Sequence, residues 1–208
     1  MIELPVEREN RNALYLLSAI CMILLTLAVA VQPLFMRNIL GVSFASAGAA
    51  NASVLVVTEL MDMTLVMFLG YLSDRIGRVP ITTIGFLVTA AGSFLAAYSL
   101  PLGVALGIGG LAFYYVMRVV MSLGMAAVWP QLSALAGDLT RYDDRPRMMA
   151  NAAFMMALGG TLVYALLMQI PRHAGVLTVM ILTSVIAVIG AVVTRGFLKD
   201  VAPRLEKD

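Results

Sequence analysis

Long apolar runs alternate with short polar segments along almost the whole chain. Each run is close to the roughly 20 residues that cross a bilayer as a helix. The six runs are Ala13–Phe35, Ala47–Tyr71, Ile81–Leu100, one span within Leu102–Gly137, Met148–Ile170 and Ala174–Phe197. The runs are continuous and do not alternate with a period of two, so they predict membrane-spanning helices and not the strands of an outer-membrane barrel.

The fourth run is too long for one straight span and too short for two. Trp129 and Pro130 lie near its end, and proline kinks or ends a helix. We therefore expect one span plus a bent extension at this point. In the same run, Gly103, Gly107 and Gly110 predict a small-residue face for close helix packing.

Composition supports a membrane environment. Of the 208 residues, 61% are hydrophobic and 12% are charged, whereas soluble domains carry about 25% charged residues. The net charge of +2, without a basic cluster interleaved with aromatics, gives no indication of a nucleic-acid partner. The predicted fold class is an all-α integral membrane protein, a bundle of six transmembrane helices with lipid as its surroundings.

Lysine and arginine are distributed unevenly between the two sides that this topology predicts. One side has only Arg37 and Arg172, against eleven residues on the other. The eleven are Arg8, Arg11, Arg75, Arg78, Arg141, Arg145, Arg147, Arg195, Lys199, Arg204 and Lys207. Because basic loops stay in the cytoplasm, we expect a cytoplasmic N-terminal segment at 1–12, a transmembrane domain at 13–197 and a cytoplasmic tail at 198–208.

The segment after the second run carries the most specific motif, Gly70-Tyr71-Leu72-Ser73-Asp74-Arg75-Ile76-Gly77-Arg78. It resembles motif A of the major facilitator superfamily, G-x-x-x-D-R-x-G-R, in the same place between the second and third helices. The matching residues are Gly70, Asp74, Arg75, Gly77 and Arg78. The resemblance implies a conformational latch that holds two halves of a transporter together in one access state.

Elementary chemistry agrees with a structured turn at this motif. Gly70 permits a close approach of two helices, and Gly77 permits a tight turn. Asp74 precedes the third helix, whose N-terminus carries partial positive charge. Pro80 suits the first turn of that helix.

A second, partial resemblance to the superfamily covers the fourth helix and the loop after it. The corresponding residues are Arg118, Gly124, Pro130, Asp138 and Arg145, with Ser122 where a glycine is usual. On this resemblance Asp138 and Arg145 are expected partners in the cytoplasmic loop. The fifth helix carries Gly159-Gly160 but not the Gly-Pro signature of the family's drug/proton antiporters, so symport and antiport both stay open.

The family normally has twelve helices, so six spans correspond to the N-terminal half of a secondary transporter that moves a small solute or ion. A second copy or another partner is expected to supply the other half. A truncated product, or a scaffold or regulator docking on a full-length relative, is the alternative. The segment Glu9–Tyr15 also resembles facilitator-type proteins of bacterial magnetosome membranes, which are associated with iron uptake; this implies a bacterial inner membrane or one derived from it.

Three charged residues are predicted to lie within the membrane. Glu59 and Asp62 are three positions apart, so they share a helix face, and Arg118 lies on the fourth helix. Such groups usually face a cavity or each other, so a structural ion pair between Arg118 and one acid is one interpretation. The remaining acid then requires a proton or a cation, which makes these residues candidates for coupling or substrate binding.

The other notable residues favour no further chemistry. Met117, Met121 and Met125 repeat at helical spacing, and Met61, Met63 and Met67 cluster on the second helix. Without accompanying cysteine or histidine, packing is preferred over a soft-metal site. Gln32-Pro33 is expected either to break the first helix and expose carbonyls or to mark its end.

No enzymatic or cofactor chemistry is expected. The chain has one histidine and one cysteine, His173 in an outer loop and Cys21 in an apolar run. They form no nucleophile–base pair within the membrane and no metal site. No phosphate-binding glycine-rich motif is present either.

Overall fold

The computed structural model describes residues 5–140 and 142–199, and the fold of this part is helical without strands. Its elements are α1 (Pro5–Asn38), α2 (Phe44–Ile76), α3 (Arg78–Ala97), α4 (Ser99–Ala105), α5 (Gly110–Asp138), η1 (Tyr142–Asp144), α6 (Arg145–Ala165), η2 (Leu167–Gln169), α7 (Ile170–Ala174) and α8 (Val176–Phe197). Six stretches are long and apolar enough to cross a membrane: Arg8–Asn38, Phe44–Ile76, α3, α5, Tyr142–Ala174 and α8. The predicted all-α bundle with six spans is confirmed.

The helices extend beyond several of the apolar runs that predicted them. α1 includes polar residues at both ends, and α2 continues through the charged motif to Ile76. Pro33 lies inside α1, which continues as a helix to Asn38. The expected break or end at Gln32-Pro33 is therefore wrong, because one missing backbone donor does not end a helix whose neighbouring turns stay packed.

The fourth run divides at a place other than the one predicted. The short helix α4 precedes the span, and α5 runs through Pro130 without interruption to Asp138. The break falls at Leu106–Gly109, where Gly107 and Gly109 both have positive φ angles. Gly103 and Gly110 do make close contacts, between α4 and the start of α5, but the three glycines do not share one helix face.

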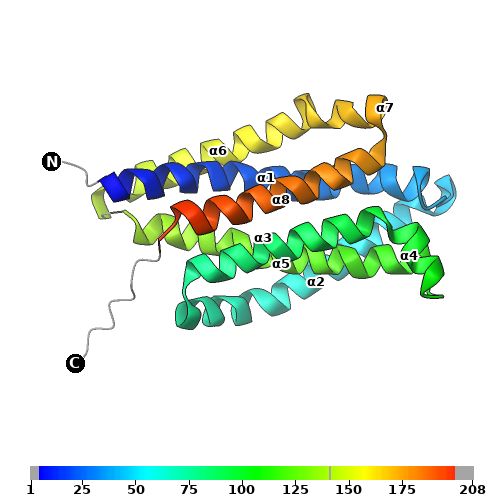
Figure 1. Ribbon diagram of the computed structural model, residues 1–208, viewed down its shortest axis with the longest axis horizontal. Coiled ribbons are helices and arrows are strands. Elements are labelled where there is room, and N and C mark those ends of the chain that lie inside the picture. The colour runs from blue at the N-terminus through cyan, green and yellow to red at the C-terminus, as the bar shows by residue number, and fades with distance from the viewer. Residues whose placement is uncertain (1–4, 141, 200–208) are drawn as a thin grey trace.

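The six spans run side by side, and α1 begins at the end of the bundle where α8 ends (Figure 1). There the backbone N–H of Lys199 donates a hydrogen bond of 3.0 Å to Oδ1 of the buried Asn10. The α2–α3 turn and the α5–α6 connection lie at the same end, which gathers the predicted cytoplasmic arginines on one side (Figure 1). Arg141, Arg204 and Lys207, and most of the expected tail at 198–208, lie outside the described residues.

The packed centre of the bundle is formed by α1, α3, α5 and α8. α3 packs against α5 and α8, and α1 against α6 and α8. Along α1, Leu17, Leu24 and Val31 recur every seven residues and are fully buried, as expected for one inward face of a helix. α2 and the span Tyr142–Ala174 are peripheral, since only 11% of the most apolar part of each is buried, against 44–56% in the other spans.

The motif at the α2–α3 junction is a turn of a single residue. Gly77 ends α2 and precedes α3 with φ +107° and ψ 151°, and its N–H donates to the carbonyl of Ser73. This backbone region is essentially restricted to glycine, which confirms the predicted tight turn. Gly70 is different: a side chain added there would meet nothing within 4 Å, so the predicted close helix approach is absent among the described residues.

Gly77→Ala is expected to destabilise the fold by about 1–3 kcal/mol, because a Cβ strains this backbone conformation. Gly196→Ala on α8 is the control, since its added methyl group meets nothing within 4 Å and its helical backbone accepts alanine. Thermal unfolding of the detergent-solubilised variants measures both. Equal unfolding midpoints for the two variants would contradict the assigned turn.

Candidate functional site

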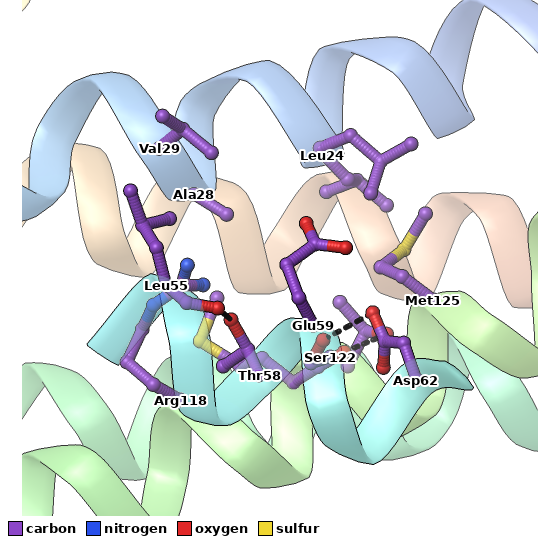
Figure 2. A pocket seen from close by; sticks show the side chains of 13 residues that line it. Leu24, Ala28, Val29, Leu55, Thr58, Glu59, Asp62, Arg118, Ser122 and Met125 are labelled. Carbon is purple, nitrogen blue, oxygen red and sulfur yellow. Dashed lines mark hydrogen bonds between the residues drawn. The ribbon is translucent and has the colours of Figure 1, made fainter. Parts of the chain in front are cut away.

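A cavity of about 80 Å³ lies within the span region, between α1, α2, α3 and α5. The apolar part of its wall comes largely from α1, and the polar part from α2, α3 and α5. Its lining residues are Leu24, Leu25, Ala28, Val29, Leu55, Thr58, Glu59, Asp62, Thr89, Arg118, Met121, Ser122 and Met125. The structure thus brings the three predicted intramembrane charges, Glu59, Asp62 and Arg118, to one place (Figure 2).

Asp62 is held by one of its two carboxylate oxygens. Its Oδ2 accepts a hydrogen bond of 2.7 Å from the hydroxyl of Ser122 on α5 (Figure 2). Its Oδ1 is buried and has no hydrogen-bond partner within residues 5–140 and 142–199. A buried acceptor without a partner is costly, so this oxygen is a point where the cavity favours a proton or a cation.

Glu59 lies one helical turn before Asp62 and is exposed. Its carboxylate points from α2 toward α1 (Figure 2). The two acids therefore occupy one wall of the cavity but differ in setting. Asp62 is fixed by Ser122, whereas Glu59 lies at the open edge of the site.

Arg118 is 5% exposed, and its guanidinium is held by an amide. Its Nε donates to Oε1 of Gln32 on α1 over 2.9 Å. The Nε2 of Gln32 donates in turn to Oδ1 of Asn51 over 2.7 Å and to the Asn51 carbonyl over 3.2 Å. Three helices, α1, α2 and α5, are joined by this chain of polar groups.

The predicted ion pair between Arg118 and an acid is not formed among the described residues. The guanidinium bonds to Gln32, and Asp62 bonds to Ser122. Sequence reasoning could not foresee this arrangement, because it depends on which buried amide lies opposite Arg118 in the packed bundle. The available signal was the polar Gln32 in an otherwise apolar run; Asn51 and Ser122 gave none.

The motif at the α2–α3 junction forms a second charged cluster, away from the cavity. Nε of Arg78 lies 2.9 Å from Oδ2 of Asp138, which ties the start of α3 to the end of α5. Asp74 lies 3.8 Å from the same arginine and is 70% exposed. Asp138 is thus a partner of this loop, whereas Arg145 donates to the carbonyl of Gly137 instead.

Arg75 and the predicted latch face the outside of the bundle. The Arg75 guanidinium lies 4.6 Å from the centre of the exposed Tyr71 ring. Asp74 and Arg75 are both exposed at the end of α2. Asp74 lies near Arg78, and Arg75 lies over Tyr71, both at the junction itself, so their predicted role toward another half stays a prediction.

The methionines divide into two groups. Met121 and Met125 on α5 are buried, and Met117 packs against the same core, which agrees with the packing interpretation. Met63 and Met67 on α2 are 73% and 81% exposed. Packing inside this bundle is therefore the wrong interpretation for the α2 cluster. His173 is exposed on α7, as expected for a solvated loop residue.

Comparisons with known proteins agree with this architecture. The chain is 57% identical to the magnetosome protein MamH of Paramagnetospirillum magneticum over 97% of its own length and 47% of the relative. It is 41% identical to the magnetosome protein MamZ of Magnetospirillum gryphiswaldense over 92% of its length and 30% of that protein. The inner membrane transport protein YajR of Escherichia coli is 36% identical over 50% of the chain and 21% of its own length.

The chain thus spans about half the length of MamH, and less of the other two relatives. Residues 14–208 match the sequence profile of the Major Facilitator Superfamily. That match covers five of the six apolar spans completely, and the first span from residue 14 onward. The chain is a multi-pass membrane protein, and it belongs to the Major Facilitator Superfamily.

Proposed function

We propose that this chain forms one half of a secondary transporter, which moves a small solute or ion across a bacterial membrane by alternating access. The observation that carries the proposal is the cavity within the spans that Glu59, Asp62 and Arg118 line together. Ionisable groups at such depth mark substrate paths and proton relays. The similarity to YajR, whose name describes a transport protein, supports the same function class.

Ion coupling is the second part of the proposal. Two acids and one arginine line the cavity, so their formal charges sum to −1 when all are ionised. Asp62 Oδ1 lacks a partner among the described residues, and a proton on this carboxyl removes the excess charge. Asp62 is the proposed coupling group, and Glu59 at the open edge guides the cation or proton into the site.

The proposed second half packs against the peripheral faces of the bundle. α2 and the Tyr142–Ala174 span expose large apolar side chains such as Met67 and Phe154. The exposed Asp74 and Arg75 lie at the end of the α2 face, in the position that suits a latch. A second copy, a separate chain or a further segment fits this role equally well.

The proposed location is a bacterial inner membrane or a magnetosome membrane. Two of the relatives, MamH and MamZ, are named magnetosome proteins, and their identities of 57% and 41% extend over nearly the whole chain. The resemblance seen in the first helix implies iron, so iron is the first solute to assay.

Uptake by proteoliposomes tests the proposal directly. The protein is reconstituted alone and together with candidate second halves, and radioactive iron uptake is followed with an imposed pH gradient and after adding an uncoupler. We expect uptake that depends on the gradient and that requires a second six-helix bundle. Stable binding to a full-length relative without any solute movement would instead favour a scaffold or regulator.

A further inference from the structure

Arg118 and Asp62 line the same cavity with opposite charge, yet they do not pair. In a low-dielectric site such groups attract strongly, and a buried charge without a counter-ion is costly. Something in the structure must therefore favour the separated arrangement. The charged groups that line the cavity are Glu59 and Asp62 from α2 and Arg118 from α5, while α1 contributes apolar side chains and α3 contributes Thr89.

Gln32 is the group that holds the arginine. It is 1% exposed, and its Oε1 accepts from Arg118 while its Nε2 donates twice to Asn51. The orientation of this amide is fixed by chemistry, because a guanidinium only donates and a backbone carbonyl only accepts. Both Nε2 hydrogens are thereby used, so Gln32 cannot rotate without losing bonds on both sides.

We infer that Gln32 is a positioning residue that holds the Arg118 guanidinium toward α1 and thereby keeps it off Asp62. Without this acceptor, the Arg118 guanidinium would be free to turn to Asp62, which lines the same cavity and whose Oδ1 has no partner among the described residues. The resulting ion pair would occupy the site that the proposed function assigns to the coupling proton. This inference rests on that proposed function.

Carbodiimide labelling of Asp62 provides the test, because dicyclohexylcarbodiimide reacts with protonated carboxyls in apolar surroundings. The full chain is labelled in lipid nanodiscs over a range of pH, and modification of Asp62 is measured by peptide mass spectrometry. An adjacent opposite charge changes a protonation equilibrium by a factor of about 10 or more. We therefore expect Gln32→Leu to lower labelling of Asp62 at least about tenfold.

Two variants separate positioning from a purely structural role. Gln32→Glu loses the two bonds to Asn51 but offers Arg118 a carboxylate, a stronger acceptor than the amide, so its labelling should not fall below the wild-type level. Gln32→Leu combined with Arg118→Gln removes the competing cation, so its labelling should return to at least the wild-type level. Ser18→Ala is the matched control on α1, since this buried hydroxyl donates to the Leu14 carbonyl of its own helix and the change should leave labelling unaltered.

The outcomes distinguish this inference from the proposed function. Unchanged labelling in a monodisperse Gln32→Leu protein, or failure of the double variant to recover, would overturn the inference alone. If Gln32→Leu does not fold, Asn51→Ala loosens the same amide and should lower labelling in the same direction; unchanged labelling there overturns the inference as well. A wild type that is not labelled at Asp62 at any pH would overturn the coupling role and the inference together.

Discussion

Asp62→Asn is expected to reduce gradient-driven uptake to the level measured without a gradient. An amide keeps the size of the side chain and accepts from Ser122 as Asp62 Oδ2 does, but it does not take up or release a proton in this pH range. The formal charge of the cavity lining also changes from −1 to zero, because the positive charge of Arg118 is then balanced by the negative charge of Glu59. Downhill counterflow of the solute should persist, because the fold and the cavity are retained.

Glu59→Gln is the matched comparison for this result. Glu59 is on the same helix and lines the same cavity, but it is exposed and makes no hydrogen bond in the described part of the chain. The Glu59→Gln change should therefore lower the uptake rate without removing the dependence of uptake on the pH gradient. Full gradient dependence in Asp62→Asn, or identical loss in both variants, would contradict the assignment of Asp62 as the coupling group.

Gly124→Ala is expected to destabilise the bundle by about 1–3 kcal/mol, the usual cost of overpacking a close contact. Gly124 on α5 lies against Gly85 on α3, and a Cβ added at Gly124 would come 2.6 Å from the Gly85 carbonyl oxygen and closer still to the hydroxyl of Thr89. A backbone atom cannot give way as a flexible side chain does. α3 and α5 would have to separate, at the contact that supports one side of the cavity.

Gly137→Ala on the same helix controls for helix propensity, since a Cβ at that position meets nothing within 4 Å. It should be neutral or stabilising by up to about 1 kcal/mol, because alanine is the better helix former. Thermal unfolding of both variants in one detergent gives the difference. A Gly124→Ala protein as stable as Gly137→Ala would show that α3 and α5 do not approach as closely as described.

Apolar length alone was enough to predict the spans of this protein, because a bilayer imposes one length on every crossing helix. It was insufficient at Leu106–Gly109, where the chain leaves α4 and enters α5 through two glycines with positive φ. Hydropathy does not record backbone dihedral angles. Pro130 predicted a bend or an end of the fourth helix, but α5 continues through this residue.

The residues of the cavity were predictable, but their pairing was not. Glu59, Asp62 and Arg118 stood out because charges are rare in apolar runs. Whether Arg118 bonds to an acid or to Gln32 depends on how α1 is rotated against α5, which no local pattern specifies. The same limit applies to Gly70. The motif predicted a close helix approach at this residue, but a side chain added there would meet nothing within 4 Å in this bundle.

The proposed function requires water to reach the cavity lined by Glu59, Asp62 and Arg118 within the membrane. The chain has one cysteine, Cys21, so Cys21→Ser gives a background in which single cysteines report their surroundings. Leu55→Cys would place a thiol on the cavity wall, and Val185→Cys would place one on the outer face of α8, where Val185 is 49% exposed.

A membrane-impermeant methanethiosulfonate reagent, applied to the protein in membranes, distinguishes the two surroundings, because it requires an ionised thiol in contact with water. Water access to the cavity predicts rapid modification of Leu55→Cys and no modification of Val185→Cys. Equal protection of both thiols, or faster reaction at Val185→Cys, would contradict it.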